Sequence, residues 1–231
     1  MSFTNFLRKI STGFAEESDH NNLVGITPQL DQITVKHNGE SIIIKRDQNT
    51  GAEIQSLFAK TSRPCPPFCV QPMSIATGVE TIGELELLDY MQKAQSDSSI
   101  MIIDSRLKKW VDKGTIPTAV HIPWTSLITH GDAKISTFLL KKFGVETVSS
   151  SNGDKLDFTH AKTLILFCNG TWCGQTSESI KGLLGVSYPL EKLKYYRDGM
   201  QGWVSLGLTT VLPKQQSCEV KPSCKKPFRL V

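Results

Sequence analysis

The pattern of apolar and polar residues in the first third of the chain predicts a β-hairpin. ITVKHNGESIIIKR, residues 33–46, alternates apolar and polar positions on both sides of Asn38 and Gly39. Both of these residues tolerate a positive φ, and the pair is a strong signal for a two-residue turn. The apolar positions that would share one face are Ile33, Val35, Ile42 and Ile44. A lone hairpin is marginal in water, so we expect this one to pack on another part of the chain.

From about residue 80 onward, short apolar runs alternate with helical patterns. The apolar runs predict buried strands at residues 99–104, 118–123, 163–168 and 193–199. Helical spacing predicts helices at 81–91, 135–144, 175–185 and 200–207, the first opened by a capping box of Thr81 and Glu84. The polar segment 149–161 is interpreted as a surface loop. Alternation of this kind is typical of a parallel sheet covered by helices on both faces.

These patterns divide the chain into three parts. Residues 1–79 form an N-terminal extension with the hairpin and a connector that has four prolines from Pro64 to Pro72. Residues 80–210 form the α/β domain, and residues 211–231 form a basic, proline-containing tail. The first 14 residues carry apolar side chains at helical spacing, which indicates a docked terminal helix or, as the alternative, a membrane-surface helix.

Composition narrows the function classes. The chain has 231 residues, 39% of them hydrophobic, and a formal net charge of +4, which is too small for the basic footprint of a nucleic-acid binder. No apolar run reaches the roughly 20 residues that span a bilayer, and no secretory signal is visible. We therefore expect a cytoplasmic protein that binds no nucleic acid. A homodimer is left open.

The six cysteines, at positions 65, 69, 168, 173, 218 and 224, are the main source of candidate chemistry. In a cytoplasmic chain with a real core we expect reduced thiols. Cys168 ends a predicted strand, and a glycine-containing loop and a helix follow it. Loop amides and the positive end of a helix both favour a thiolate, so we expect a depressed pKa and a nucleophilic Cys168, with Thr176 or Ser177 capping the helix. The alternative is a small apolar residue that ends a strand.

Three motifs then occur in order: IIDSRLKKWVDKGTIPTAVHIPWTSL, LILFCNGTWCGQTS and YYRDGMQGW. They resemble the first signature, the catalytic strand and loop, and the closing Gly-x-x-x-Trp element of a rhodanese-like (sulfurtransferase) domain, over roughly residues 80 to 210. The departures are Thr115, where His is usual, and Thr118, where Gly is usual. The expected fold is a rhodanese-like α/β fold, a doubly wound parallel sheet flanked by helices, with the N-terminal hairpin-containing extension.

The resemblance implies a sulfurtransferase without metal or other cofactor. Cys168 would take a sulfane sulfur from thiosulfate, a polysulfide or a persulfide, and would pass it to a thiol or cyanide acceptor. The loop whose amides would hold the persulfide comprises Asn169, Gly170, Thr171, Trp172, Cys173 and Gly174. Asp104 and Arg106 would be a supporting structural pair, with Asp104 bracing either the loop or Arg106. The related phosphatases need Cys-x5-Arg, and Gly174 stands where that arginine would be, so we exclude a phosphatase.

Several alternatives stay open at this stage. No Lys or Arg lies in residues 169–174, which favours a persulfide, polysulfide or protein-bound donor over thiosulfate. Cys173 is either a resolving thiol or an inert one, and Trp172 is either a pocket wall or a packing residue. Cys65, Cys69, Cys218 and Cys224 are expected to be free structural thiols, with a zinc site, a disulfide or a redox relay to Cys168 as alternatives. The second function hypothesis is a sulfur carrier or sensor, or a docking module with little turnover.

Overall fold

The computed structural model describes residues 24–128, 135–151 and 153–213. The predicted N-terminal helix, Cys218, Cys224 and most of the basic tail lie outside these residues. The sequence motifs of the α/β domain lie within them. The fold and the candidate site can therefore be compared with the sequence predictions.

The centre of the molecule is a parallel sheet of five strands in the order β3-β9-β8-β4-β5. The strands are β3 Glu80–Ile82, β4 Ile100–Asp104, β5 Val120–His121, β8 Thr163–Phe167 and β9 Leu193–Tyr196. β8 pairs with β4 on one side and with β9 on the other, so it is the central strand. The predicted strands are confirmed, and β3 is an additional one.

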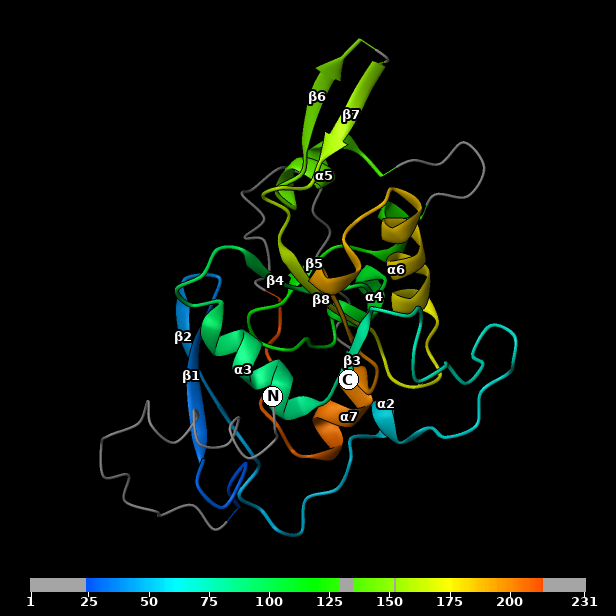
Figure 1. Cartoon of the computed structure of the whole chain (residues 1–231). Coiled ribbons are helices and arrows are strands. Elements are labelled where there is room, and N and C mark those ends of the chain that lie inside the picture. The colour runs from blue at the N-terminus through cyan, green and yellow to red at the C-terminus, as the bar shows by residue number, and fades with distance from the viewer. Residues whose placement is uncertain (1–23, 129–134, 152, 214–231) are drawn as a thin grey trace, which may run out of the picture.

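Helices and two short 3-10 turns surround this sheet (Figure 1). They are α2 Ser56–Ala59, α3 Glu84–Lys93, α4 Lys108–Val111, η1 Trp124–Ser126, α5 Thr137–Lys142, α6 Gln175–Gly185, η2 Leu190–Lys192 and α7 Gly199–Ser205. Alternate side chains of β8 enter two separate hydrophobic clusters. Ile165 packs with α3 and α7, whereas Leu164 and Leu166 pack with α5 and α6. Both faces of the sheet are covered, as the continuous apolar strands predicted.

The N-terminal hairpin is confirmed, with the predicted apolar residues on one face. It consists of β1 Gln32–His37 and β2 Glu40–Lys45, which pair antiparallel with Ile33 opposite Ile44. Asn38 and Gly39 both have positive φ, 51° and 84°, as the turn requires. The buried side chains of the hairpin join the cluster beneath α3, and the hairpin lies beside that helix (Figure 1). The extension is thus packed on the domain.

The start of α3 was predicted wrongly. Helix α3 begins at Glu84 with Gly83 as its N-cap, and Glu86 accepts a 3.0 Å hydrogen bond from the Gly83 amide. Thr81, assigned to the capping box, instead lies in β3 opposite Tyr195 of β9. Thr81 pairs with β9 as part of an edge strand of the sheet, and this pairing is favoured over the helix start that the local T-x-x-E pattern predicts.

The polar segment 149–161 was predicted as a loop, but most of it forms the outer part of an antiparallel hairpin. Strands β6 Glu146–Ser150 and β7 Gly153–Asp157 pair with each other and project away from the sheet beyond α5 (Figure 1). Gly153 has a φ of 100°. The sequence carries Asn152-Gly153 at this turn, the same signal that identified the first hairpin, and the polar composition concealed it.

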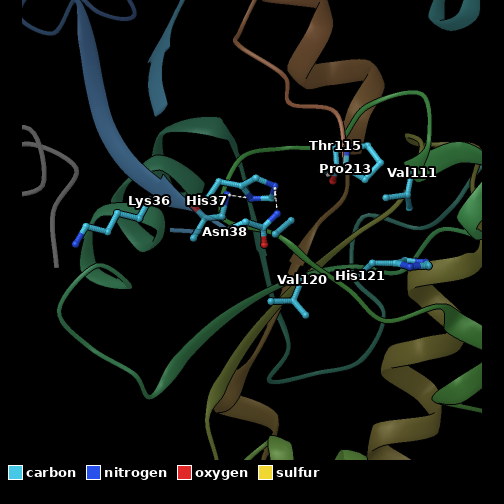
Figure 2. Close-up of a pocket in the computed structure, with 10 residues that line it drawn as sticks. Lys36, His37, Asn38, Val111, Thr115, Val120, His121 and Pro213 are labelled. Carbon is cyan, nitrogen blue, oxygen red and sulfur yellow. Dashed lines mark hydrogen bonds between the residues drawn. The ribbon is translucent and has the colours of Figure 1, made fainter. Parts of the chain in front are cut away.

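A cleft of about 560 Å³ lies between the first hairpin and the segment that leads into β5. Figure 2 shows His37 from the hairpin on one wall and Val120 and His121 of β5 on the other. Thr118 adopts a φ of 72°, in the region that favours glycine, and its amide donates a 3.1 Å hydrogen bond to Nδ1 of His37. Thr118, which stands where the signature usually has glycine, thus adopts a backbone conformation that favours glycine.

Candidate active site

Cys168 follows the last residue of β8, at the carboxyl end of the central strand. The chain then passes through residues 168–174, here called the cysteine loop, into helix α6. The start of α7 closes against this loop, because the amide of Met200 donates a 2.9 Å hydrogen bond to the carbonyl oxygen of Cys168. Gly199 permits this approach: its φ is 53°, and a Cβ there would lie 2.4 Å from that oxygen. The third sequence motif, YYRDGMQGW, therefore contacts and supports the cysteine loop directly.

The thiol of Cys168 is buried, and its surroundings disfavour the anionic form. Its side chain is 2% exposed, and Sγ donates a hydrogen bond of 2.9 Å to the carbonyl oxygen of Cys173. Burial raises the pKa of the Cys168 thiol well above its ordinary value, and contact with Cys173 raises it further. The prediction of a depressed pKa at Cys168 is therefore wrong for this conformation of the loop.

The anion-stabilising groups surround Cys173 instead. Its pKa is lowered to about 7, first by a hydrogen bond from the Cys168 side chain and then by the backbone amides of Asn169 and Gln175. The side-chain amide of Asn169 also donates to the Cys173 sulfur, at 3.7 Å. The two thiols interact, so they lose their protons as a pair, and the opposite pKa shifts favour Cys173 over Cys168 as the site of the first negative charge.

The predicted helix cap is also corrected. Gly174 is the N-cap of α6 and makes no side-chain capping bond, whereas Thr176 and Ser177 lie inside the helix. The hydroxyl of Ser177 donates to Oε1 of Gln71 at 2.8 Å. It therefore connects α6 to the N-terminal extension and does not satisfy the amides of its own helix.

Asp104 and Arg106 form a buried ion pair at the end of β4. Arg106 Nη2 lies 2.6 Å from Oδ2 of Asp104, and Arg106 is fully buried. The hydroxyl of Thr115 donates to the same carboxylate oxygen at 2.7 Å, and Arg106 donates to the carbonyl oxygen of Gly114 at 2.6 Å. Of the two roles predicted for Asp104, the contacts are those of a brace for Arg106. Thr115 supplies the hydrogen bond at the position where the signature usually has histidine.

The proline-rich segment, residues 63–72, lies against the cysteine loop, and we call it the strap. The amide of Gln71 donates a 2.7 Å hydrogen bond to the carbonyl oxygen of Thr171. Arg197, which follows β9, donates to the carbonyl oxygen of Gln71 at 2.9 Å. The strap is therefore fixed to both the loop and the sheet.

Trp172 is the contact between the loop and the strap. Its ring has the guanidinium of Arg63 3.7 Å from its centroid and Phe68 edge-on at 5.6 Å. Its indole nitrogen donates to Oε1 of Gln201 on α7 at 2.8 Å. The structure thus answers the question about Trp172: it is a packing residue that joins three segments far apart in sequence.

Cys65 and Cys69, at the middle of the strap, form a disulfide. The prediction that all of the thiols are free and reduced is wrong for this pair. Cys168 and Cys173 are free thiols. Because both sulfurs of the strap pair are already bonded, they do not serve as zinc ligands in this state. Within the described residues, no group of three or more His, Cys, Asp and Glu side chains could hold a metal ion.

A cleft of about 580 Å³ opens beside the loop, between the strap, α4, η1 and α6. Cys173 and Cys69 line it, whereas Cys168 is not among its lining residues. Lys109 supplies positive charge from outside the loop, whereas the charge of Lys181 is compensated by Glu178, which also lines the cleft and lies 2.8 Å from it. Phe68, Trp110 and Trp124 supply apolar surface. Sequence analysis did not assign these residues to the site. Lys109, Trp110 and Trp124 lie within the first motif, but the motif alone does not show that they face the cysteine loop, and Phe68 and Lys181 lie outside the three motifs.

Three buried polar atoms of residues that line this cleft have no hydrogen-bond partner among the described residues. They are Nε1 of Trp124, Oδ1 of Asn169 and Oε1 of Gln175. Buried polar groups without partners are rare in folded proteins. The three atoms are themselves buried, so a ligand in the cleft could pair with this donor and these two acceptors only after the lining side chains move.

Comparison with known proteins identifies the class to which this fold and site belong. The family model of the rhodanese-like domain matches residues 86–206, more than half of the chain. The chain belongs to the rhodanese-like family. A solution NMR structure of a rhodanese-like domain from Anabaena is similar at 13% identity, with a TM-score of 0.36, and the match covers 68% of this chain and 92% of that one. No curated protein matches. In the described part of the chain, no helix has the length and apolar character needed to cross a membrane.

Proposed function

We propose that this protein is a sulfurtransferase that moves a sulfane sulfur through a persulfide on Cys168. The observation that carries the proposal is the thiol pair at the end of β8, where Cys168 contacts a neighbour whose pKa is lowered to about 7. Cys168 lacks a charge of its own, but Cys173 is placed to accept its proton. The Cys168 sulfur then attacks the outer sulfur of the donor, and the donor's remaining group leaves as an anion.

The persulfide that forms would be stabilised by the start of α6. Burial raises the pKa of the Cys168 thiol, and a hydrogen bond from the backbone amide of Thr176 to the Cys168 sulfur acts in the opposite direction and lowers that pKa. A helix N-terminus favours an anion, and no metal is needed for this step. Because Cys168 is 2% exposed, the outer part of the cysteine loop must move aside for a donor to reach it.

The cleft favours an organic persulfide or polysulfide as the donor. The loop carries no basic residue, and the atoms of Trp124, Asn169 and Gln175 that lack partners would be able to pair with amide and carboxylate groups of a donor once the cysteine loop moves and exposes them. We therefore expect glutathione persulfide to be a better donor than thiosulfate. A thiol would be the acceptor.

A donor panel tests this proposal. The rate of sulfur transfer to a thiol acceptor is measured with glutathione persulfide, inorganic polysulfide and thiosulfate. Trp124→Phe keeps the ring but removes Nε1, and we expect it to raise KM for glutathione persulfide roughly fivefold, since one hydrogen bond is worth about 1 kcal/mol. KM for thiosulfate should change little. Transfer with none of the donors would support the alternative, a sensor or docking module.

A further inference from the structure

Two cysteine pairs in different oxidation states meet at the 580 Å³ cleft. Cys65 and Cys69 are a disulfide in the strap, and Cys168 and Cys173 are free thiols in the cysteine loop. One member of each pair, Cys69 and Cys173, lines the cleft. The inner member of the loop pair, Cys168, does not line it, and the outer member of the strap pair, Cys65, is exposed to solvent.

The strap holds its disulfide against the loop through contacts on both sides of Cys69. Phe68 packs edge-on against Trp172, at 5.6 Å between ring centroids, and Gln71 is bonded through its backbone amide to Thr171. Trp172 and Thr171 are the two residues that precede Cys173. The segment that contains Cys69 is thus aligned along the segment that contains Cys173. A purely structural disulfide would not need this alignment.

We propose that Cys65 and Cys69 are a redox pair that supplies the two electrons for releasing the Cys168 sulfur as sulfide. This rests on the proposed function, because it begins from the Cys168 persulfide. The thiolate of Cys173 attacks the inner sulfur, Sγ of Cys168. The bond to the outer sulfur breaks, hydrosulfide leaves, and a Cys168–Cys173 disulfide forms. The thiol pair has then been oxidised and the transferred sulfur reduced.

The reduced strap pair restores the loop in two exchange steps. The Cys69 thiolate attacks Cys173, which forms a Cys69–Cys173 disulfide and releases Cys168 as a thiol. The Cys65 thiolate then attacks Cys69, which releases Cys173 and forms the Cys65–Cys69 disulfide. In sum, one persulfide and two strap thiols give one Cys168 thiol, one hydrosulfide, one proton and one strap disulfide. The structure has the oxidation states of this end point.

The positions of the four sulfurs fit this order. Cys173 contacts Cys168 and also lines the cleft, so it is the member of the loop pair placed to exchange with the strap. When Cys168 carries a persulfide, its thiol no longer donates to Cys173, but the backbone amides of Asn169 and Gln175 still favour the Cys173 thiolate that the first attack needs. Cys65 is exposed, so a small or protein dithiol from solution can reduce the strap disulfide again. In reducing compartments, disulfides are usually transient and catalytic, as this one would be.

Product stoichiometry tests the relay. The protein is reduced with dithiothreitol, freed of reductant without oxygen, and given excess thiosulfate or methanethiosulfonate. The amount of sulfite or methanesulfinate formed gives the number of sulfur atoms transferred to the protein. The amount of sulfide formed gives the number of those atoms released by reduction. The wild type holds two dithiol pairs that can take part, so it should release two equivalents of sulfide per chain. Cys65→Ser with Cys69→Ser should release one, and Cys173→Ser none.

Two further measurements distinguish failure of the relay from failure of the proposed function. Cys218→Ser with Cys224→Ser also removes two cysteines, and it should release two equivalents as the wild type does. Peptide mapping of the wild type after one equivalent of donor should find the Cys65–Cys69 disulfide. Either of two results overturns the relay alone. One is release of two equivalents of sulfide by the variant with Cys65→Ser and Cys69→Ser. The other is a Cys168–Cys173 disulfide in the wild type after one equivalent of donor. Absence of sulfite and sulfinate from the wild type, together with absence of a Cys168 persulfide after glutathione persulfide and inorganic polysulfide, overturns the proposed function with it.

Discussion

The amide of Gln71 donates a 2.7 Å hydrogen bond to the carbonyl oxygen of Thr171, which ties the N-terminal extension to the cysteine loop. The side chain of the same residue accepts a 2.8 Å hydrogen bond from Ser177 on α6. The strap therefore spans from the loop to the helix behind it. Access to Cys173 depends on a segment that lies outside the family's matched region of residues 86–206.

Loosening the strap should expose Cys173. Gln71→Ala removes the bond from Ser177 and a 2.9 Å bond from the Gln71 side chain to the Cys69 carbonyl oxygen, but leaves the backbone bond to Thr171. Loss of about 1 kcal/mol of restraint should raise the rate of Cys173 alkylation about fivefold. Iodoacetamide labelling followed by peptide mass analysis measures this rate. Gln32→Ala, an exposed change on β1, is the matched control and should leave it unaltered.

The lowered pKa of Cys173 predicts when this thiol becomes reactive. A thiolate with a pKa of about 7 is half formed at that pH, so alkylation should accelerate as pH rises through about 7 and level off above it. The largest cause is the hydrogen bond from Cys168, so Cys168→Ala should shift the midpoint upward. Labelling across pH 5–10, in protein with Cys218 and Cys224 replaced by serine, measures both midpoints. If Cys168→Ala does not change the pH midpoint of Cys173 alkylation, then Cys168 is not the cause of the lowered pKa of Cys173.

The Asp104–Arg106 pair should contribute mainly to stability. Asp104→Asn leaves the Arg106 guanidinium buried without its counter-charge, and breaking a buried pair in this way costs about 3–5 kcal/mol. Urea unfolding should show this loss. The matched control is Asp112→Asn, which breaks an exposed pair with Lys108 and should cost about 0.5 kcal/mol or less. A loss at Asp104 no larger than the control's would contradict the buried bracing role.

The elements of the α/β domain could be predicted because their signals are local. Continuous apolar runs such as that of β8, and the Asn38-Gly39 turn, are decided by residues that neighbour one another in sequence. The start of α3 could not be predicted, because β3 exists through pairing with β9, more than a hundred residues away. The β6–β7 hairpin was missed because a polar hairpin without a buried face lacks the alternation that identifies strands.

At the candidate site, the position of Cys168 could be predicted but its protonation could not. Its place between a strand and a helix follows from the pattern of residues 163–185. The charge on the thiol depends on which loop amides point at which sulfur, and the loop turns those of Asn169 and Gln175 toward Cys173. The strap disulfide depends on how the chain turns between Cys65 and Cys69, which their spacing alone did not decide.

The most direct test of the central claim is the mass of the protein after exposure to a sulfane-sulfur donor. Reduced wild type and the variants Cys168→Ser and Cys173→Ser are treated with glutathione persulfide, inorganic polysulfide and thiosulfate, and intact and peptide masses are measured. Cys173→Ser lacks the thiolate that accepts the Cys168 proton, so it should gain one sulfur atom on the peptide that contains Cys168 more slowly than the wild type and should then retain it. The wild type should carry the same adduct transiently. Cys168→Ser should gain none at this loop. Absence of the Cys168 adduct from the wild type and from Cys173→Ser with all three donors would contradict sulfur transfer through Cys168.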